Sequence, residues 1–337
     1  MMQRILVPLD GSARAERALP VAARIARNTG ATLLLLRVTV PVVDSRTSLG
    51  LAGTSQQAIL ESEQEKVRAY LEGMSRLGDL ATLQVGTVAL SGIPAETILS
   101  YIEANNVDLV VMCSHGYTGF KRWALGSVAQ HVAKHSSAPV LVLRERSPKP
   151  QELLPEAGKS LRALVALDRS LFAEAALIPT IQLVGALAGH GQGVVHLIQV
   201  VQMPTVEQAM EYERYDDEVR RQILSEAGSY LQSVCDRLMQ GPAARFGVNV
   251  VWSVEESKDV ARTLTLAAEL GEGADREDAC DFIALATHGR SGLKHLRIGS
   301  VTERVMAKSQ LPLLIVHPQE VHEASRVAPY QAEVLER

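Results

Sequence analysis

The feature that most constrains the fold of this chain is an internal repeat. Residues 4–12 (RILVPLDGS) are matched by residues 162–170 (RALVALDRS), which lie 158 positions further along. A second pair of matching segments begins at Ser114 and at Thr287, 173 positions apart. The second copy therefore holds 15 more residues between these landmarks, partly in the polar stretch from Gly271 to Ala279. Such self-similarity indicates that one structural unit is built twice.

The length of the chain agrees with two domains. Its 337 residues exceed the usual size of a single core, and each half is long enough to bury its own. A segment with three prolines and many charges separates the copies and is typical of a linker. We predict a first domain over residues 1–146, a linker over 147–160, a second domain over 161–318 and a polar tail over 319–337.

Each copy alternates short apolar runs with longer stretches of helical period, which favours an α/β fold with a parallel sheet covered by helices. Helices are expected over Ala13–Thr29, with a stop at Gly30, and over Ser55–Leu77. The expected strands of the first copy are Arg4–Leu9, Thr32–Val38, Leu83–Ala89, Leu109–Cys113 and Pro139–Leu143. Those of the second copy are Arg162–Leu167, Gly193–Val200, Asn249–Val254, Asp281–Leu285 and Pro312–Val316.

Composition excludes several functional classes. A net charge of −4 and only 4% aromatic residues argue against a nucleic-acid partner, which would need a basic surface and exposed rings. The most apolar run considered, Ala31 to Val43, is too short to span a bilayer, so we expect no membrane association. Three cysteines without a CxxC pair indicate neither a disulfide framework nor a zinc site and agree with a reducing cytoplasm.

The unusual residues of each copy follow the predicted strands, at the edge where open parallel sheets bind ligands. Asp10 and Ser12 follow the first strand, and Gly116 follows the fourth. Gly126 and Ser127 then open the last helix, whose first amide groups and partial positive charge suit a phosphate. Simple helix capping is the competing explanation of a Gly-Ser pair, but the repetition at fixed offsets favours a phosphate site in the first copy.

On these motifs the sequence resembles the universal stress protein family in its tandem two-domain form, from Arg4 to about His317. The resemblance implies two Rossmann-like domains, each a five-stranded parallel sheet of order 3-2-1-4-5 with helices on both faces. The family pattern is Gly, two residues, Gly, nine residues, then Gly with Ser or Thr. This chain lacks the first glycine, since Cys113 and Ala286 stand there, which keeps open a loss of nucleotide binding.

The resemblance implies binding of ATP or another adenine nucleotide, with Mg²⁺ accompanying it, and a stress-response role. It implies that Asp10 and Asp168 border the ribose and adenine and that the backbone at Val38 and Val200 contacts the base. The predicted nucleotide-binding residues of the first copy are Asp10, Ser12, Val38, Gly116, Gly119, Gly126, Ser127 and Val128. The candidates for a second site are Asp168, Val200, Gly289, Gly292, Gly299, Ser300 and Val301.

The two copies are unequal, and the first is the better candidate. It keeps the turn Gly92-Ile-Pro94 before its third helix, whereas the second copy has Lys258-Asp-Val260 there and Arg169 after Asp168. These changes indicate that the second copy holds a ligand differently or not at all. Arg290 and Arg297 of the second loop would nevertheless favour phosphate.

Histidine and cysteine side chains invite two further hypotheses. His131 and His135 have the i, i+4 spacing of zinc ligands, but Arg304 and Lys308 replace them in the second copy, so we expect no metal. Cys113 is interpreted as a small buried residue rather than a redox centre.

The leading functional hypothesis is a nucleotide-binding or signalling module without catalysis. A slow ATP hydrolase or phosphotransfer enzyme, and a structural pseudo-dimer, are the alternatives. In members of the family the two last strands often pair, so we expect the same pairing within this chain, while a further homodimer is left open.

Overall fold

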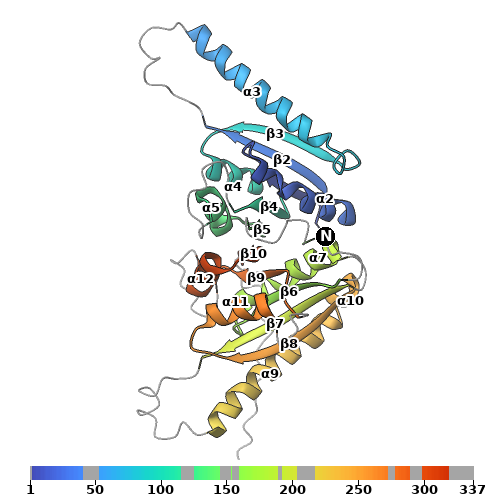
Figure 1. Cartoon of the computed structure of the whole chain (residues 1–337), viewed down its shortest axis with the longest axis vertical. Helices are drawn as coiled ribbons and strands as arrows, with labels where there is room; N and C mark the ends of the chain where they lie inside the picture. Colours follow the sequence, from blue (N-terminus) through green and yellow to red (C-terminus); the bar gives the residue numbers. More distant parts are fainter. Residues whose placement is uncertain are drawn as a thin grey trace, which may run out of the picture.

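The protein forms one ten-stranded sheet with helices on both faces, as seen in a computed structural model (Figure 1). The structure describes residues 2–40, 53–114, 125–144, 153, 159–188, 192–202, 217–271, 278–288 and 298–318. The strand order is β3-β2-β1-β4-β5-β10-β9-β6-β7-β8. Each half therefore has the order 3-2-1-4-5, as the family resemblance predicted, and the fold class is confirmed.

All strand pairs within a half are parallel. The first half contains β1 (Arg4–Pro8), β2 (Thr32–Thr39), β3 (Val85–Ser91), β4 (Leu109–Cys113) and β5 (Val140–Leu143). The second half contains β6 (Leu161–Ala166), β7 (Gly193–Val201), β8 (Val248–Glu256), β9 (Phe282–Ala286) and β10 (Leu313–Val316). The expected strands are all present, with ends that differ by two residues at most.

The helices divide between the two faces of the sheet because the chain crosses from one face to the other after the third strand of each half. One face carries α1 (Ala13–Glu16), α2 (Ala18–Thr29), α3 (Gly53–Ser75), α6 (Leu171–Glu174), α7 (Leu177–Ala188), α9 (Asp217–Met239) and α10 (Pro242–Phe246). The other face carries α4 (Pro94–Ala104), α5 (Ser127–His135), α11 (Val260–Leu270) and α12 (Ser300–Lys308). The long helices α3 and α9 lie at opposite ends of the molecule (Figure 1).

The predicted helix Ala13–Thr29 is interrupted, and proline explains the interruption. Pro20 has no N–H to donate to the carbonyl of Glu16, and its ring crowds that carbonyl, so α1 ends there and α2 begins at Ala18. Pro179 acts in the same way in the second half, where α6 ends at Glu174 and α7 begins at Leu177. The predicted stop at Gly30 is confirmed, because this residue ends α2 in the left-handed conformation at φ +72°.

The two halves meet through their last strands. β5 and β10 pair antiparallel in the register Leu313 with Val142, Leu314 with Leu141 and Ile315 with Val140. The strand pairing expected from the sequence is therefore present in the structure. Because each half is otherwise parallel, this single antiparallel step points the carboxyl ends of the strands in opposite directions in the two halves.

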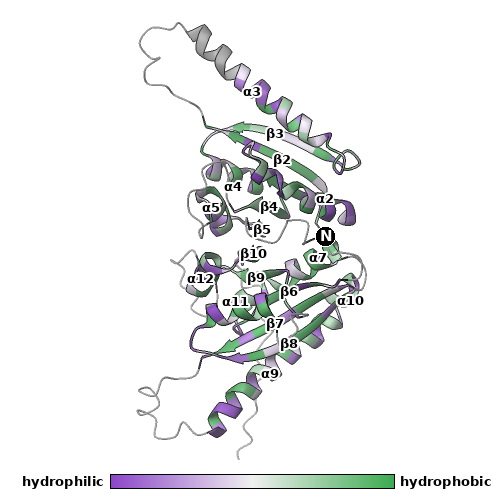
Figure 2. Ribbon diagram, in the orientation of Figure 1, coloured by the Kyte–Doolittle hydropathy of each residue, from purple (hydrophilic) through white to green (hydrophobic). Residues whose placement is uncertain are grey.

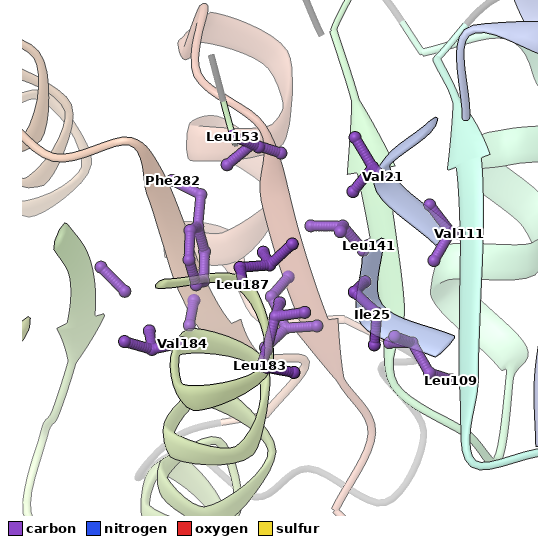
Figure 3. Packing of buried hydrophobic residues seen from close by; sticks show 14 of the residues in the cluster. Val21, Ile25, Leu109, Val111, Leu141, Leu153, Leu183, Val184, Leu187 and Phe282 are labelled. Atoms are coloured by element: carbon purple, nitrogen blue, oxygen red, sulfur yellow. The ribbon is translucent and has the colours of Figure 1, made fainter. Parts of the chain in front are cut away.

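Apolar side chains form layers that continue across this seam. The strands are mostly hydrophobic, with hydrophilic stretches on β7 and β8, while α9 carries both hydrophobic and hydrophilic residues (Figure 2). One core cluster contains Ile25 and Leu141 from the first half together with Leu187 and Phe282 from the second (Figure 3). Leu153, from the predicted linker, is buried in the same cluster. Buried residues of both halves thus pack into common cores.

One segment of this core resembles a membrane span by composition. Leu171–Ala188, which covers α6 and α7, is long and apolar enough to cross a bilayer, unlike the run Ala31 to Val43 considered in the sequence. However, 56% of the segment is buried inside the protein. Leu183, Val184 and Leu187 pack in the shared cluster (Figure 3), so the segment has the environment of a core helix.

Sharing of the core predicts that the whole chain unfolds as one unit. Leu141 is fully buried at the seam, and Leu141→Ala should lower the free energy of unfolding by about 2–5 kcal/mol through lost burial and the cavity left behind. Leu266→Ala, at a helix position that is 43% exposed, is the matched control and should change it by less than about 1 kcal/mol. Denaturant unfolding followed by circular dichroism should show a single transition, and two separate transitions would contradict the shared core.

Candidate functional site

The candidate site of each half lies where neighbouring loops leave the sheet toward opposite faces. After β1 the chain enters α1 and α2 on one face, and after β4 it leads to α5 on the other. In the second half β6 and β9 have the same relation, followed by α6 and α12. Such a switch point opens a crevice at the carboxyl ends of the two central strands.

The turn after the first strand is held by an aspartate and a serine. The backbone N–H of Ser12 and its hydroxyl both donate to Oδ1 of Asp10, at 2.9 and 2.6 Å. The Ser12 oxygen in turn accepts the N–H of Ala15 at 3.2 Å and caps α1. Ser12 was predicted as a nucleotide-binding residue, and the structure gives its hydroxyl these two local partners.

The second half repeats this turn despite its different sequence. Ser170 donates to Oδ1 of Asp168 from its N–H at 3.0 Å and from its hydroxyl at 2.6 Å, and it caps α6. Gly11 has a φ of +85°, and Arg169 at the equivalent position has a φ of +69°. An arginine therefore occupies a conformation that favours glycine, and the carboxylate keeps its place. The backbone of this turn is therefore alike in the two halves.

Each last helix begins at a glycine. Gly126 and Gly299 are the N-cap residues of α5 and α12, and having no side chain they do not cap the first amide groups themselves. In both halves the glycine N–H donates over 2.5 Å to the carbonyl that ends the preceding strand region, that of Ser114 or Thr287. Within the described residues, Ser127 and Ser300 follow the N-cap position and do not occupy it. The first amides of these helices can receive an anion.

The second half contains a pocket at this place. It has a volume of about 270 Å³. Five of the second-site candidates line it, namely Asp168, Val200, Gly299, Ser300 and Val301. Gly289 and Gly292 lie outside the described residues, as do Gly116, Gly119, Arg290 and Arg297. In the first half Asp10, Val38, Gly126, Ser127 and Val128 occupy the equivalent positions of the fold.

Sequence reasoning missed much of the apolar wall of this pocket and some of its polar lining, including Gln202 and Thr302. Val260 and Leu264 from α11 and Leu285 from β9 supply the wall. Gln202, just beyond β7, lies at the rim and donates to the carbonyl of Lys258 over 3.1 Å. The wall residues belong to ordinary amphipathic patterns, so only the knowledge of which face each helix covers could have identified them.

The thiol at the missing glycine position is partly buried. Cys113 ends β4, and burial raises its pKa to about 12, so it is a protonated thiol at neutral pH. Ala286 occupies the same position in the second half, where it lines the pocket. The structure therefore supports the interpretation of Cys113 as a small packing residue.

The histidines of α5 join helices together. His131 Nε2 lies 3.0 Å from Oε1 of Glu96 in α4, and its ring lies 4.2 Å from that of His135. In the second half Arg304 takes the place of His131 and contacts both oxygens of Asp259, at 2.7 and 2.6 Å. Over the part of the chain that the structure describes, no three His, Cys, Asp or Glu side chains form a group able to hold a metal ion.

Comparisons with known proteins agree on one family. The chain matches the Universal stress protein family over residues 1–144 and again over residues 160–317. A universal stress protein of Mycolicibacterium smegmatis is 24% identical over 323 residues, which cover 94% of this chain and 97% of that protein. Universal stress protein MJ0531 of Methanocaldococcus jannaschii is 32% identical over 146 residues, 43% of this chain and 84% of its own length.

The fold is found in solved structures as well. The crystal structure of a universal stress protein from Archaeoglobus fulgidus superposes with a TM-score of 0.59 at 19% sequence identity. The match covers 95% of this chain and 97% of that one, so it includes both halves.

The turn after β1 yields a prediction on backbone strain. The turn holds Gly11 at a positive φ, which is unfavourable for any residue with a Cβ. A Cβ at this position would also lie 2.9 Å from the guanidinium of Arg37. Gly11→Ala should therefore lower the free energy of unfolding by about 1–2 kcal/mol. Gly73→Ala, inside α3 with free space around it, is the matched control and should raise it by about 0.5–1 kcal/mol. Equal effects at the two positions, measured by denaturant unfolding, would contradict this view of the turn.

A second prediction concerns acid stability. Burial lowers the pKa of His317, and the nearby His288 and His135 lower it further. The unfolded chain then binds a proton more readily than the folded one, so stability should fall as pH drops through the ordinary histidine range near about 6.5. His317→Gln should reduce this loss, measured as the change in melting temperature between neutral and mildly acidic buffer. An unchanged pH profile in the variant would contradict the assignment.

Proposed function

Because the chain belongs to the universal stress protein family, we propose that it binds ATP or a related adenine nucleotide and acts as a binding or signalling module in the stress response. The observation that carries this proposal is the pocket of the second half. Five residues selected from the sequence for contact with a nucleotide lie around one cavity there. Their convergence would be unexpected if the glycine motif served only to start a helix.

The chemistry of the pocket suits the parts of a nucleotide. Val200, Val260 and Leu264 offer an apolar surface to a base, and Asp168 offers carboxylate oxygens to hydroxyl or amino groups. The first amides of α12, next to Gly299 and Ser300, suit the phosphates. The same pocket thus brings together the apolar, acceptor and anion-binding groups that the base, sugar and phosphates of a nucleotide require.

The proposal extends to the first half on the grounds of equivalent structure. Asp10 has the same hydrogen bonds as Asp168, and α5 begins at Ser127 in the way that α12 begins at Ser300. The preserved turn at Arg169 also removes one reason to rank the second half lower. We therefore propose one nucleotide site in each half.

We also propose a cytoplasmic location. The cysteines Cys113, Cys235 and Cys280 are all free thiols in the structure. Free thiols persist where the cellular environment is reducing.

The proposal predicts two sites that can be disabled separately. Calorimetric titration of ATP into the whole protein should show binding, and Gly126→Val or Gly299→Val should each remove one site by covering the helix-start amides. The loss of affinity at the altered site should be tenfold or more, or at least about 1.4 kcal/mol. Both glycines have negative φ values, −58° and −71°, that any residue adopts. A Cβ at Gly299 would lie 3.3 Å from the carbonyl oxygen of Thr287, so circular dichroism of each variant is needed to confirm folding.

Gly73→Ala serves as the control and should bind like the unaltered protein. Absence of heat and of any thermal shift with ATP and ADP in the unaltered protein would overturn the proposal. Steady turnover of ATP that Asp10→Ala abolishes would instead favour the hydrolase alternative.

A further inference from the structure

The residue that follows the last strand differs in kind between the two halves. Arg144 follows β5 and His317 follows β10. The positions are equivalent, because Ser114 donates to the carbonyl of Leu143 and Thr287 donates to that of Val316, both over 2.8 Å. Arg144 and His317 therefore each lie beside the segment that leads from the fourth strand of their half toward the candidate site. One half carries a permanent cation there and the other an imidazole.

His317 contacts His288, which lines the pocket of the second half. Its ring centroid is 5.3 Å from that of His288 in an edge-to-face arrangement, and its Nδ1 lies 3.2 Å from the carbonyl of Pro318. His288 lines the pocket together with Gly299 and Ser300, where the proposed phosphate would lie. A proton on either ring would therefore sit close to the anion.

Groups from the first half complete this environment. Because the halves are antiparallel at the seam, the last turn of α5 approaches the second site, bringing Lys134 and His135. Lys134 Nζ pairs with Oε1 of Glu303, in the first turn of α12, at 3.1 Å. The Glu303 carboxylate thus already contacts a cationic group of the first half.

These neighbours make a proton on His317 unfavourable in the free protein. Burial is the main cause of its lowered pKa, and the nearby imidazoles of His288 and His135 add to the effect. A bound phosphate would act in the opposite direction, because a negative charge stabilises a protonated imidazole. Arg144 is charged without a bound phosphate. Burial lowers its pKa to about 10, which still leaves it charged at neutral pH, and its guanidinium donates to the carbonyl of Met306.

We propose that nucleotide binding in the second half is coupled to uptake of a proton by the His288–His317 pair, whereas binding in the first half, beside Arg144, is not. This inference rests on the proposed function. His317 acts here as a positioning and charge-setting residue behind His288. By linkage, phosphate affinity in the second half increases as pH falls, so the two sites of one chain respond differently to acidification.

The test measures each site alone within the full chain. Gly126→Val leaves the second site and Gly299→Val leaves the first, and each variant is titrated with ATP between about pH 7.5 and pH 6.0. Affinity should rise about three- to tenfold more at the second site than at the first, since a single coupled proton contributes at most tenfold per pH unit. Ionisation of ATP itself affects both variants alike and cancels in the comparison.

Two further measurements identify the source of the coupling. Titration in two buffers of different ionisation enthalpy should count up to one proton taken up at the second site and a smaller number at the first. Adenosine, which lacks phosphate, should bind with little dependence on pH. In the Gly126→Val background, both His317→Arg and His317→Gln should abolish the pH dependence of ATP affinity. The affinity should stay high at all pH values in His317→Arg, which keeps a positive charge, and low in His317→Gln, which has none. Arg144→His in the Gly299→Val background should introduce a dependence at the first site.

Equal pH slopes at the two sites, or a slope that survives both His317 substitutions, would overturn the proton coupling while leaving nucleotide binding intact. No binding of ATP or adenosine by the unaltered protein would overturn the proposed function, and the coupling with it.

Discussion

The antiparallel pairing of β5 with β10 is the contact on which the rest of the molecule depends. It joins two five-stranded sheets into one and buries Leu141 and Leu314 completely at the junction. It also covers the strand edge that each half would otherwise expose, a row of unpaired backbone groups prone to association. A tandem chain can make this contact within one molecule, so pairing of the halves does not depend on protein concentration.

The direction of this pairing decides what surrounds each site. Because the strands of the two halves point in opposite directions, the last helix of one half ends beside the site of the other. Arg144 at the end of β5 reaches the last turn of α12, and Lys134 in the last turn of α5 reaches the first turn of α12. The sites are thus built from repeated parts but lie in different electrostatic surroundings. Differences outside the glycine motif therefore matter as much as the motif itself.

Much of the fold was predictable from the repeat. The matching segments placed the same strand, turn and helix start twice, and the structure repeats the hydrogen bonds of Asp10 and Ser12 at Asp168 and Ser170. The predicted helix Ala13–Thr29 was too long because helical periodicity alone gives no weight to the missing N–H of Pro20. The sequence difference at Arg169 did not reveal that the turn around it keeps the left-handed φ and the Asp–Ser hydrogen bonds found at Gly11.

The candidate site was predictable in part. Asp168, Gly299 and Ser300 stand out in the sequence because they follow a strand or open a helix and repeat the motif of Asp10, Gly126 and Ser127. Val260 and Leu264 do not, since apolar residues of a helix could face any neighbour until the packing is known. His288 and His317 follow two different strands, and their rings meet only once the sheet has formed. Nothing in the sequence around either residue indicates that contact.

The central claim is that the start of each last helix, together with the aspartate after the first strand, forms a nucleotide site. A crystal structure of the full chain grown with ATP tests it most directly. The account predicts phosphate oxygens within hydrogen-bonding distance of the first amides of α12, with the base against Val200 and the ribose near Asp168. The same arrangement is predicted at α5 and Asp10. ATP bound elsewhere on the protein, with both helix starts lacking phosphate at saturating nucleotide, would contradict it.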